Sequence, residues 1–125
     1  LLYNGQEVES PQKLGLFVRE PVAWDQHHAT AARAFYQRVL HLVRTHRALV
    51  ARDLSEVETS APDDVIAYRR RNVVVLVNAR NREVRVTVAG FDVGGARDLL
   101  TDRTQQGDTV TLPAYGAMVL ERRGS

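Results

Sequence analysis

The chain has 125 residues, of which 44% are hydrophobic and 26% are charged, a balance typical of a globular domain with its own hydrophobic core. No apolar run approaches the roughly 20 residues that a membrane-spanning helix requires, so we expect no membrane partner. The absence of cysteine excludes disulfide bonds and thiolate metal sites. The net charge is only +2, and the one basic run, Arg69–Arg71, is too short to predict nucleic-acid binding. We expect this run to be a solvated strand edge that discourages pairing with other strands.

The first eight residues combine an apolar stretch with a polar turn, and no initiator methionine precedes them. A strand at the start of a chain lacks its partner strands, so we expect the chain to be the tail of a larger α/β enzyme. Pro11, Gly15 and Pro21 predict a loop with short extended pieces up to Asp25. The Asp25 carboxylate can accept unpaired backbone N–H groups, which predicts a helix N-cap there.

From about His28 to Ala48, apolar residues recur at three- and four-residue spacing, which predicts an amphipathic helix. The apolar stripe comprises Ala32, Phe35, Val39, Leu42, Val43 and Leu49, with Tyr36 and Leu40 widening it. We expect Phe35 and Tyr36 to lie in a core. Exposed apolar surface on this scale favours self-association, so the stripe should be buried against the rest of the chain or a second copy.

After Ala51 the pattern changes to short β-branched segments separated by polar turns. The run from Val73 to Val77 is apolar throughout, which predicts a strand buried on both faces. Residues 84–88 alternate, which predicts a strand with one solvated face. Further strands are expected at residues 65–68, 98–101, 109–112 and 115–121. This spacing predicts an antiparallel β-sandwich of about six to seven strands, and the fold class is therefore α+β.

Several segments, in this order, resemble the C-terminal part of the alpha-amylase family, glycoside hydrolase family 13. Tyr3-Asn4-Gly5-Gln6-Glu7 is similar to the end of the last strand of the (β/α)8 barrel, and Trp24 to the tryptophan before its last helix. The helix from Phe35 to Leu49 also resembles the family, with Arg47 where proline is usual. The similar strand segments are Ile66–Arg70, Val73–Asn78, Asp98–Thr101 and Leu112–Leu120.

The resemblance implies two parts: residues 1–51 as the end of a catalytic barrel, and residues 52–125 as the C-terminal β-sandwich domain. It also implies a parent enzyme that cleaves α-glucosidic bonds of starch-like glucans or oligosaccharides with retention, by two carboxyl groups about 5–5.5 Å apart. Those carboxylates would precede Leu1, so no catalytic residue is expected here and the chain alone should be inactive. Transglucosylases share this tail, so it does not distinguish a hydrolase from a transferase.

Gln6 and Glu7 are the candidate substrate-binding residues, because they follow a barrel strand at the end where barrel enzymes assemble their active sites. They could support the substrate pocket from behind. Alternatively, Glu7 could only accept hydrogen bonds that close the strand-to-helix loop. Both interpretations remain open from the sequence.

No metal or cofactor is predicted for this chain. His27 and His28 are adjacent, and His41 and His46 lie five residues apart on a helix, so neither pair shares a face. No loop has EF-hand spacing, although many family members bind Ca²⁺ through earlier segments.

Two other functions compete with the enzyme interpretation. The sandwich could bind glucan on its own, with Trp24, Tyr68 and Tyr115 as stacking platforms, although we expect these three to be core or interdomain residues. The chain could also belong to a non-catalytic scaffold protein that has lost its carboxylates.

Overall fold

The computed structural model describes residues 5–10, 15, 17, 19–24 and 29–122. They belong to two compact units, residues 1–41 and residues 42–125, which we describe separately. None of the helices in the described residues is long and apolar enough to cross a membrane. The predicted domain boundary after residue 51 stays a prediction.

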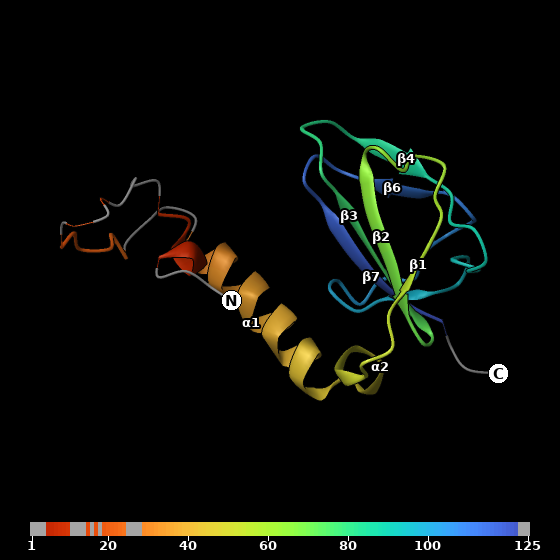
Figure 1. The fold of residues 1–125 in the computed structure, drawn as a ribbon, viewed down its shortest axis with the longest axis horizontal. Helices are drawn as coiled ribbons and strands as arrows, with labels where there is room; N and C mark the ends of the chain where they lie inside the picture. Colours follow the sequence, from red (N-terminus) through yellow and green to blue (C-terminus); the bar gives the residue numbers. More distant parts are fainter. Residues whose placement is uncertain (1–4, 11–14, 16, 18, 25–28, 123–125) are drawn as a thin grey trace. The chain divides into compact units, whose positions relative to one another are not determined.

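The first unit contains a short 3-10 helix, η1 (Gln6–Val8), and most of helix α1 (Ala29–Thr45) (Figure 1). Gly5 precedes η1 with φ of 91°, and a Cβ there would lie 3.0 Å from Cγ1 of Val22, so any other residue would be strained. Of the strand and turn predicted for residues 1–8, residues 6–8 form this 3-10 helix instead. Residues 1–4 and the predicted N-cap Asp25 lie outside the described residues.

The predicted helix is interrupted near its C-terminal end. Helix α1 stops at Thr45, His46 takes an extended conformation with ψ of 118°, and a second helix, α2, spans Arg47–Val50. The His46 carbonyl accepts hydrogen bonds from the N–H groups of Leu49 and Val50, so this break starts a new helical turn. The two helices therefore replace the single helix that the periodicity predicts.

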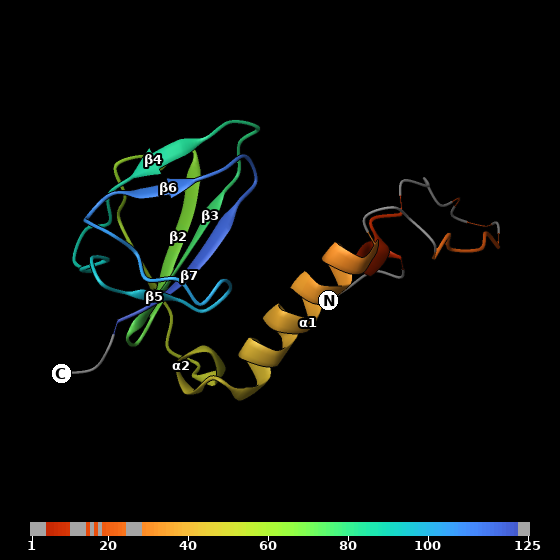
Figure 2. The ribbon, with the colours of Figure 1, turned by 180° about the vertical axis from the view of Figure 1, so that it is seen from behind.

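The second unit contains two antiparallel sheets (Figures 1 and 2). The larger sheet has the strand order β1 (Ser55–Glu56), β2 (Val65–Arg70), β3 (Val73–Asn78), β7 (Ala117–Glu121) and β5 (Arg97–Asp98). The smaller sheet pairs β4 (Val84–Val86) with β6 (Val110–Leu112). The α+β class with antiparallel sheets is confirmed, and the arrangement is consistent with a β-sandwich.

The main core lies between the two sheets. Val74 and Leu76 of β3 pack there with Val86 of β4 and Leu112 of β6, and all four side chains are fully buried. Phe91, in the connection after β4, closes the same core. This packing joins the sheets through apolar contacts rather than through shared strand pairing.

A second core lies on the opposite face of β3. Val73 and Val75 pack there with Ala48 and Leu49 of α2 and with Val119 of β7. Successive side chains of a strand point to opposite faces, so β3 supplies both cores. The prediction of a strand buried on both faces is confirmed, and so is the alternating burial of β4, whose central Arg85 is exposed.

The run Arg69–Arg71 does not lie on an edge strand, so the edge prediction is wrong, although Arg69 and Arg71 are solvent-exposed as predicted. Strand β2 is flanked by β1 and β3. Nη1 of Arg70 donates hydrogen bonds to the carbonyl oxygens of Leu49 at 2.6 Å and Ala51 at 2.9 Å. These carbonyls end α2, where no further helical N–H group is available. Arg70 therefore ties α2 to the sheet.

Asp64, just before β2, accepts hydrogen bonds from Arg80 at 2.7 Å and Arg82 at 2.6 Å in the turn between β3 and β4. The hydrogen bond from Arg80 lowers the pKa of the Asp64 carboxyl below its ordinary value, and the positive charge of Arg82 acts in the same direction. The carboxylate thus connects two segments that are separated in sequence.

We predict that Arg70→Met lowers the free energy of unfolding by about 1.5–3 kcal/mol, because two helix-end carbonyls lose a charged donor. Urea denaturation of the purified chain measures this change. The matched control is Arg85→Met, whose side chain is 75% exposed, and whose effect should stay within about 0.5 kcal/mol. Equal effects of the two substitutions would contradict the role assigned to Arg70.

We predict that Asp64→Asn destabilises the chain at about pH 7 and does so less as the pH falls below about 4. A carboxyl whose pKa is lowered by folding stabilises the native state above its unfolded pKa, and that contribution disappears as the pH falls through the folded pKa. Urea titrations of both proteins at several pH values measure the difference. A difference independent of pH would show that the ion pairs contribute nothing.

Candidate functional site

The predicted pair Gln6 and Glu7 lies in η1. The backbone N–H of Gly5 donates a hydrogen bond of 3.1 Å to Oε2 of Glu7. This contact is local to the turn that contains both residues. The role of both residues in supporting a substrate pocket stays a prediction.

The three aromatic candidates have different surroundings. Tyr68 packs against the core formed by α2 and β3, as predicted. Trp24 is 45% exposed and Tyr115 is 67% exposed, so neither is a core residue of this chain, and an interdomain position stays a prediction for both. The guanidinium of Arg33 lies 6.0 Å from the Trp24 ring, whereas Tyr115 occupies a tight turn with φ of 53°.

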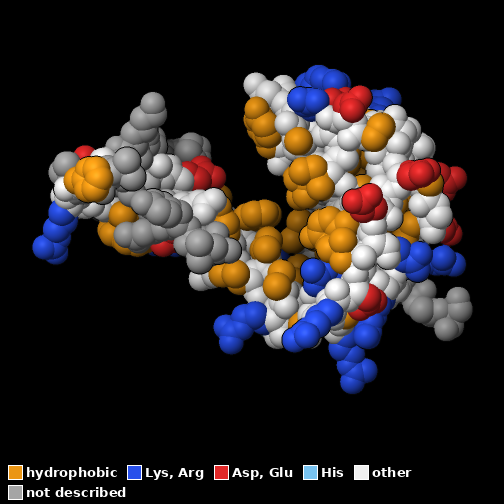
Figure 3. All heavy atoms as spheres, viewed as in Figure 1, with side chains coloured by type: hydrophobic (Ala, Val, Ile, Leu, Met, Phe, Trp, Pro, Cys, Tyr) orange, Lys and Arg blue, Asp and Glu red, His pale blue; other side chains and the backbone are white. Residues whose placement is uncertain are grey.

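The stripe of α1 is also more exposed than predicted. Phe35 is 49% exposed and contacts the Tyr36 ring edge-on, at 5.7 Å between centroids. Leu40 and Val43 are 46% and 52% exposed. The core prediction is therefore wrong for Phe35. Figure 3 shows that hydrophobic side chains reach the surface of the described residues.

His27 and His28 lie outside the described residues. In the part of the chain that the structure describes, no group of three His, Cys, Asp or Glu side chains could hold a metal ion. His46 instead pairs with Glu121 of β7, with Nε2 3.0 Å from Oε1. Asn72 donates to the same carboxylate oxygen at 3.4 Å. His46 therefore ties the break between the two helices to the sheet.

Asp98, within a segment that resembles the alpha-amylase family, serves the fold. Its side chain is 1% exposed. Oδ1 accepts hydrogen bonds from the N–H groups of Leu100 at 3.2 Å and Val119 at 3.1 Å, and Oδ2 accepts one from the Thr101 hydroxyl at 2.6 Å. With both oxygens occupied, this carboxylate holds the turn after β5 against β7.

Asn78, at the end of another such segment, has a similar role. Its amide donates to the carbonyl oxygens of Arg82 at 2.7 Å and Pro113 at 2.8 Å, and its Oδ1 accepts from the N–H of Arg80 at 2.9 Å. Gly116 follows in the same corner, where a Cβ would lie 2.6 Å from Cγ of Pro113. The residues that carry the resemblance here determine loop geometry rather than chemistry.

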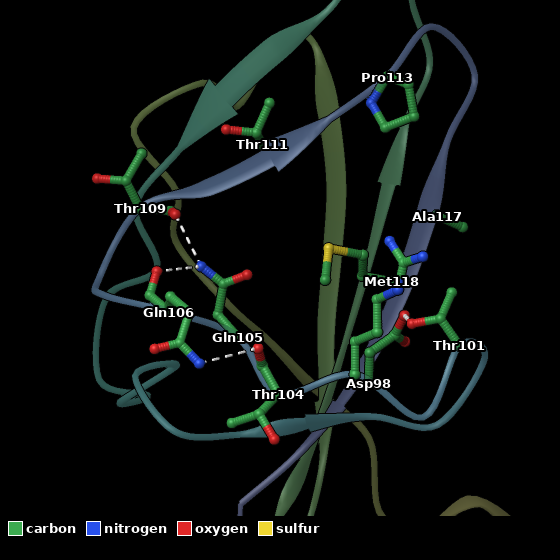
Figure 4. Close-up of a pocket in the computed structure, with 11 residues that line it drawn as sticks. Asp98, Thr101, Thr104, Gln105, Gln106, Thr109, Thr111, Pro113, Ala117 and Met118 are labelled. Atoms are coloured by element: carbon green, nitrogen blue, oxygen red, sulfur yellow. Dashed lines mark hydrogen bonds between the residues drawn. The ribbon is translucent and has the colours of Figure 1, made fainter.

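A groove of about 570 Å³ opens between β6 and the β5–β7 side of the larger sheet (Figure 4). Its walls carry hydroxyl and amide groups. The apolar residues that line it are Pro113, Ala117 and Met118. The polar lining residues come mostly from the loop between β5 and β6: Thr101, Arg103, Thr104, Gln105, Gln106 and Thr109.

The sequence alone does not predict this groove. The polar run from Thr101 to Thr109 was visible in the sequence, but it is indistinguishable there from an ordinary surface loop. Only the fold places this run opposite Thr111 of β6 and Met118 of β7.

No protein-family model matches the chain, and no curated protein matches it. Among solved structures, a noncanonic maltogenic alpha-amylase from Thermotoga neapolitana is similar, with a TM-score of 0.60 and 16% identity. The match covers 97% of this chain and 30% of that enzyme. A GH42 beta-galactosidase from G. stearothermophilus matches at a TM-score of 0.35, with 20% identity over 77% of this chain and 13% of its own. A beta-galactosidase from Bacillus circulans matches at 0.32, with 25% identity over 76% and 13% of the two chains.

The chain thus spans less than a third of the amylase with which it shares its fold. The likeness to the two galactosidases is too low to bear on this protein. The comparisons show a fold similar to part of an alpha-amylase-family enzyme, at low sequence identity.

Proposed function

We propose that this chain is the C-terminal part of an alpha-amylase-like enzyme that cleaves α-glucosidic bonds of starch-like glucans or oligosaccharides with retention. One observation carries the proposal: the likeness of fold to a maltogenic alpha-amylase extends over 97% of the chain. The order of the resembling segments along the sequence supports it independently.

In this proposal the chain has a structural role. The described residues include no group of three His, Cys, Asp or Glu side chains that could hold a metal ion. The buried Asp98 is occupied by backbone and hydroxyl donors. In the proposal the catalytic carboxylates belong to another part of the parent protein, as the resemblance to the alpha-amylase family implies.

The exposed apolar residues of α1 are the surface that we assign to the missing partner. Phe35, Leu40 and Val43 are each about half exposed. Burying such side chains is favourable, at roughly 25 cal/mol per Å² of apolar surface. In the parent enzyme, this face would pack against the catalytic part, and in the isolated chain a second copy would compete for it.

A second candidate is a non-catalytic glucan-binding or scaffold domain. The observation that favours binding is the polar groove beside β6, which contains hydroxyl and amide groups over an apolar floor. Sugar binding by this groove is compatible with either candidate, so activity of the parent distinguishes them.

The test compares the isolated chain with the protein expressed from the complete reading frame that encodes it. We expect the complete protein to cleave maltoheptaose and to release the α-anomer first, as monitored by proton NMR. The isolated chain should release no sugar at equal concentration. No cleavage by the complete protein would favour the scaffold, and an initial β-anomer would contradict retention.

The same protein tests Gln6 and Glu7. If Glu7 supports the substrate pocket, Glu7→Gln should lower kcat/KM by about tenfold, equivalent to about 1.4 kcal/mol. If Glu7 only closes its turn, Tm should fall while kcat/KM is retained. Gln6→Ala is compared in the same way, and Glu20→Gln, at an exposed position, is the control.

A further inference from the structure

We propose that the groove between β6 and the β5–β7 side binds a neutral oligosaccharide of α-linked glucosyl units. The choice of α-linked glucose rests on the proposed function, whereas the choice of a neutral polyol follows from the groove itself. Its volume of about 570 Å³ falls within the range of about 300–1,000 Å³ that is usual for small-molecule sites.

Gln105 provides a fixed acceptor. Its Nε2 donates hydrogen bonds to the carbonyl oxygens of Gln106 at 2.9 Å and Thr109 at 2.8 Å. These two bonds hold the amide plane and leave Oε1 on the opposite side. Figure 4 shows this oxygen directed into the groove. An acceptor held in place in this way loses little conformational entropy when a ligand hydroxyl donates to it.

Threonine hydroxyls in the groove can act as hydrogen-bond donors and as hydrogen-bond acceptors. Thr109 and Thr111 line the β6 side of the groove, Thr104 lies beside Gln105, and Thr101 lies beside Asp98 (Figure 4). The Thr101 hydroxyl donates to Asp98 at 2.6 Å, which leaves its lone pairs for a ligand donor. A hydroxyl group both donates and accepts, so these walls match a ligand that carries several hydroxyl groups of its own.

The floor of the groove is apolar. Met118, which also packs against the main core, lies between the two walls, and Pro113 borders its upper end (Figure 4). A pyranose ring presents C–H groups on its faces and hydroxyl groups around its rim. An apolar floor with polar walls is complementary to that distribution, since apolar contact and directed hydrogen bonds then form together.

The charges of the groove favour a neutral ligand. Its one carboxylate, Asp98, is buried and engaged by three donors. A cation would therefore find no available acidic partner in the lining. Arg103 brings one guanidinium to the lining. A guanidinium also donates to hydroxyl oxygens.

The experiment titrates the isotopically labelled chain with maltotriose and follows backbone amides and the Met118 methyl group by NMR. We expect shifts confined to residues 101–118, with affinity in the millimolar range. Arg103→Ala combined with Thr111→Val should weaken binding by about tenfold while the Tm is retained. Thr87→Val, at an exposed position outside the groove lining, is the matched control and should bind as the unmodified chain does.

Three results would overturn the proposal: no shifts at saturating maltotriose, shifts centred outside the groove, or equal affinity of the double variant and the control. Cellotriose, with β-linked glucose, tests the ligand class, and equal or tighter binding of it would overturn the assignment to α-linked units. None of these results depends on catalysis. Failure of the groove is therefore distinguishable from failure of the proposed enzyme function, which the activity of the complete protein measures.

Discussion

The burial of β3 on both faces is the constraint on which the rest of the second unit depends. Val74 and Leu76 contribute to the core between the sheets, while Val73 and Val75 contribute to the core beneath α2. A one-residue shift in the register of β3 would exchange the two sets of side chains. The pairings of β3 with β2 and β7 and the position of α2 therefore have to be satisfied together.

Hydrogen bonds from polar side chains hold the turns and the helix end that lie outside the two hydrophobic cores. Arg70 satisfies the carbonyls at the end of α2, Asp98 holds the turn after β5, and Asn78 holds the corner between β6 and β7. Each is at least partly buried and carries several hydrogen bonds, as buried polar groups must. Fixed ends of β5 and β7 also position the loop that lines the groove, so the same contacts that stabilise the fold shape the candidate sugar site.

Resemblance to a family of enzymes here reflects the fold more than the chemistry. Asp98 and Asn78 lie in the resembling segments, and both form hydrogen bonds that determine turns. The likeness to the maltogenic alpha-amylase, at 16% identity, is likewise one of fold. Activity therefore has to be tested on the complete protein, whereas ligand binding by the groove can be tested on this chain.

The sequence by itself determined the class of most elements, because hydrophobic periodicity reports which side of a helix or strand is buried. The apolar run of β3, the alternation of β4 and the amphipathic helix were all predictable from it. Only the tertiary structure decided the break at His46, the role of Arg70 and the exposure of Phe35 and Tyr115. The groove belongs to the same group, since its walls come from segments that meet only after the sheets pack. The physical reason is that the local pattern shows which face of a helix or strand is buried but not which segment covers that face. The covering segment depends on contacts between residues far apart in the sequence.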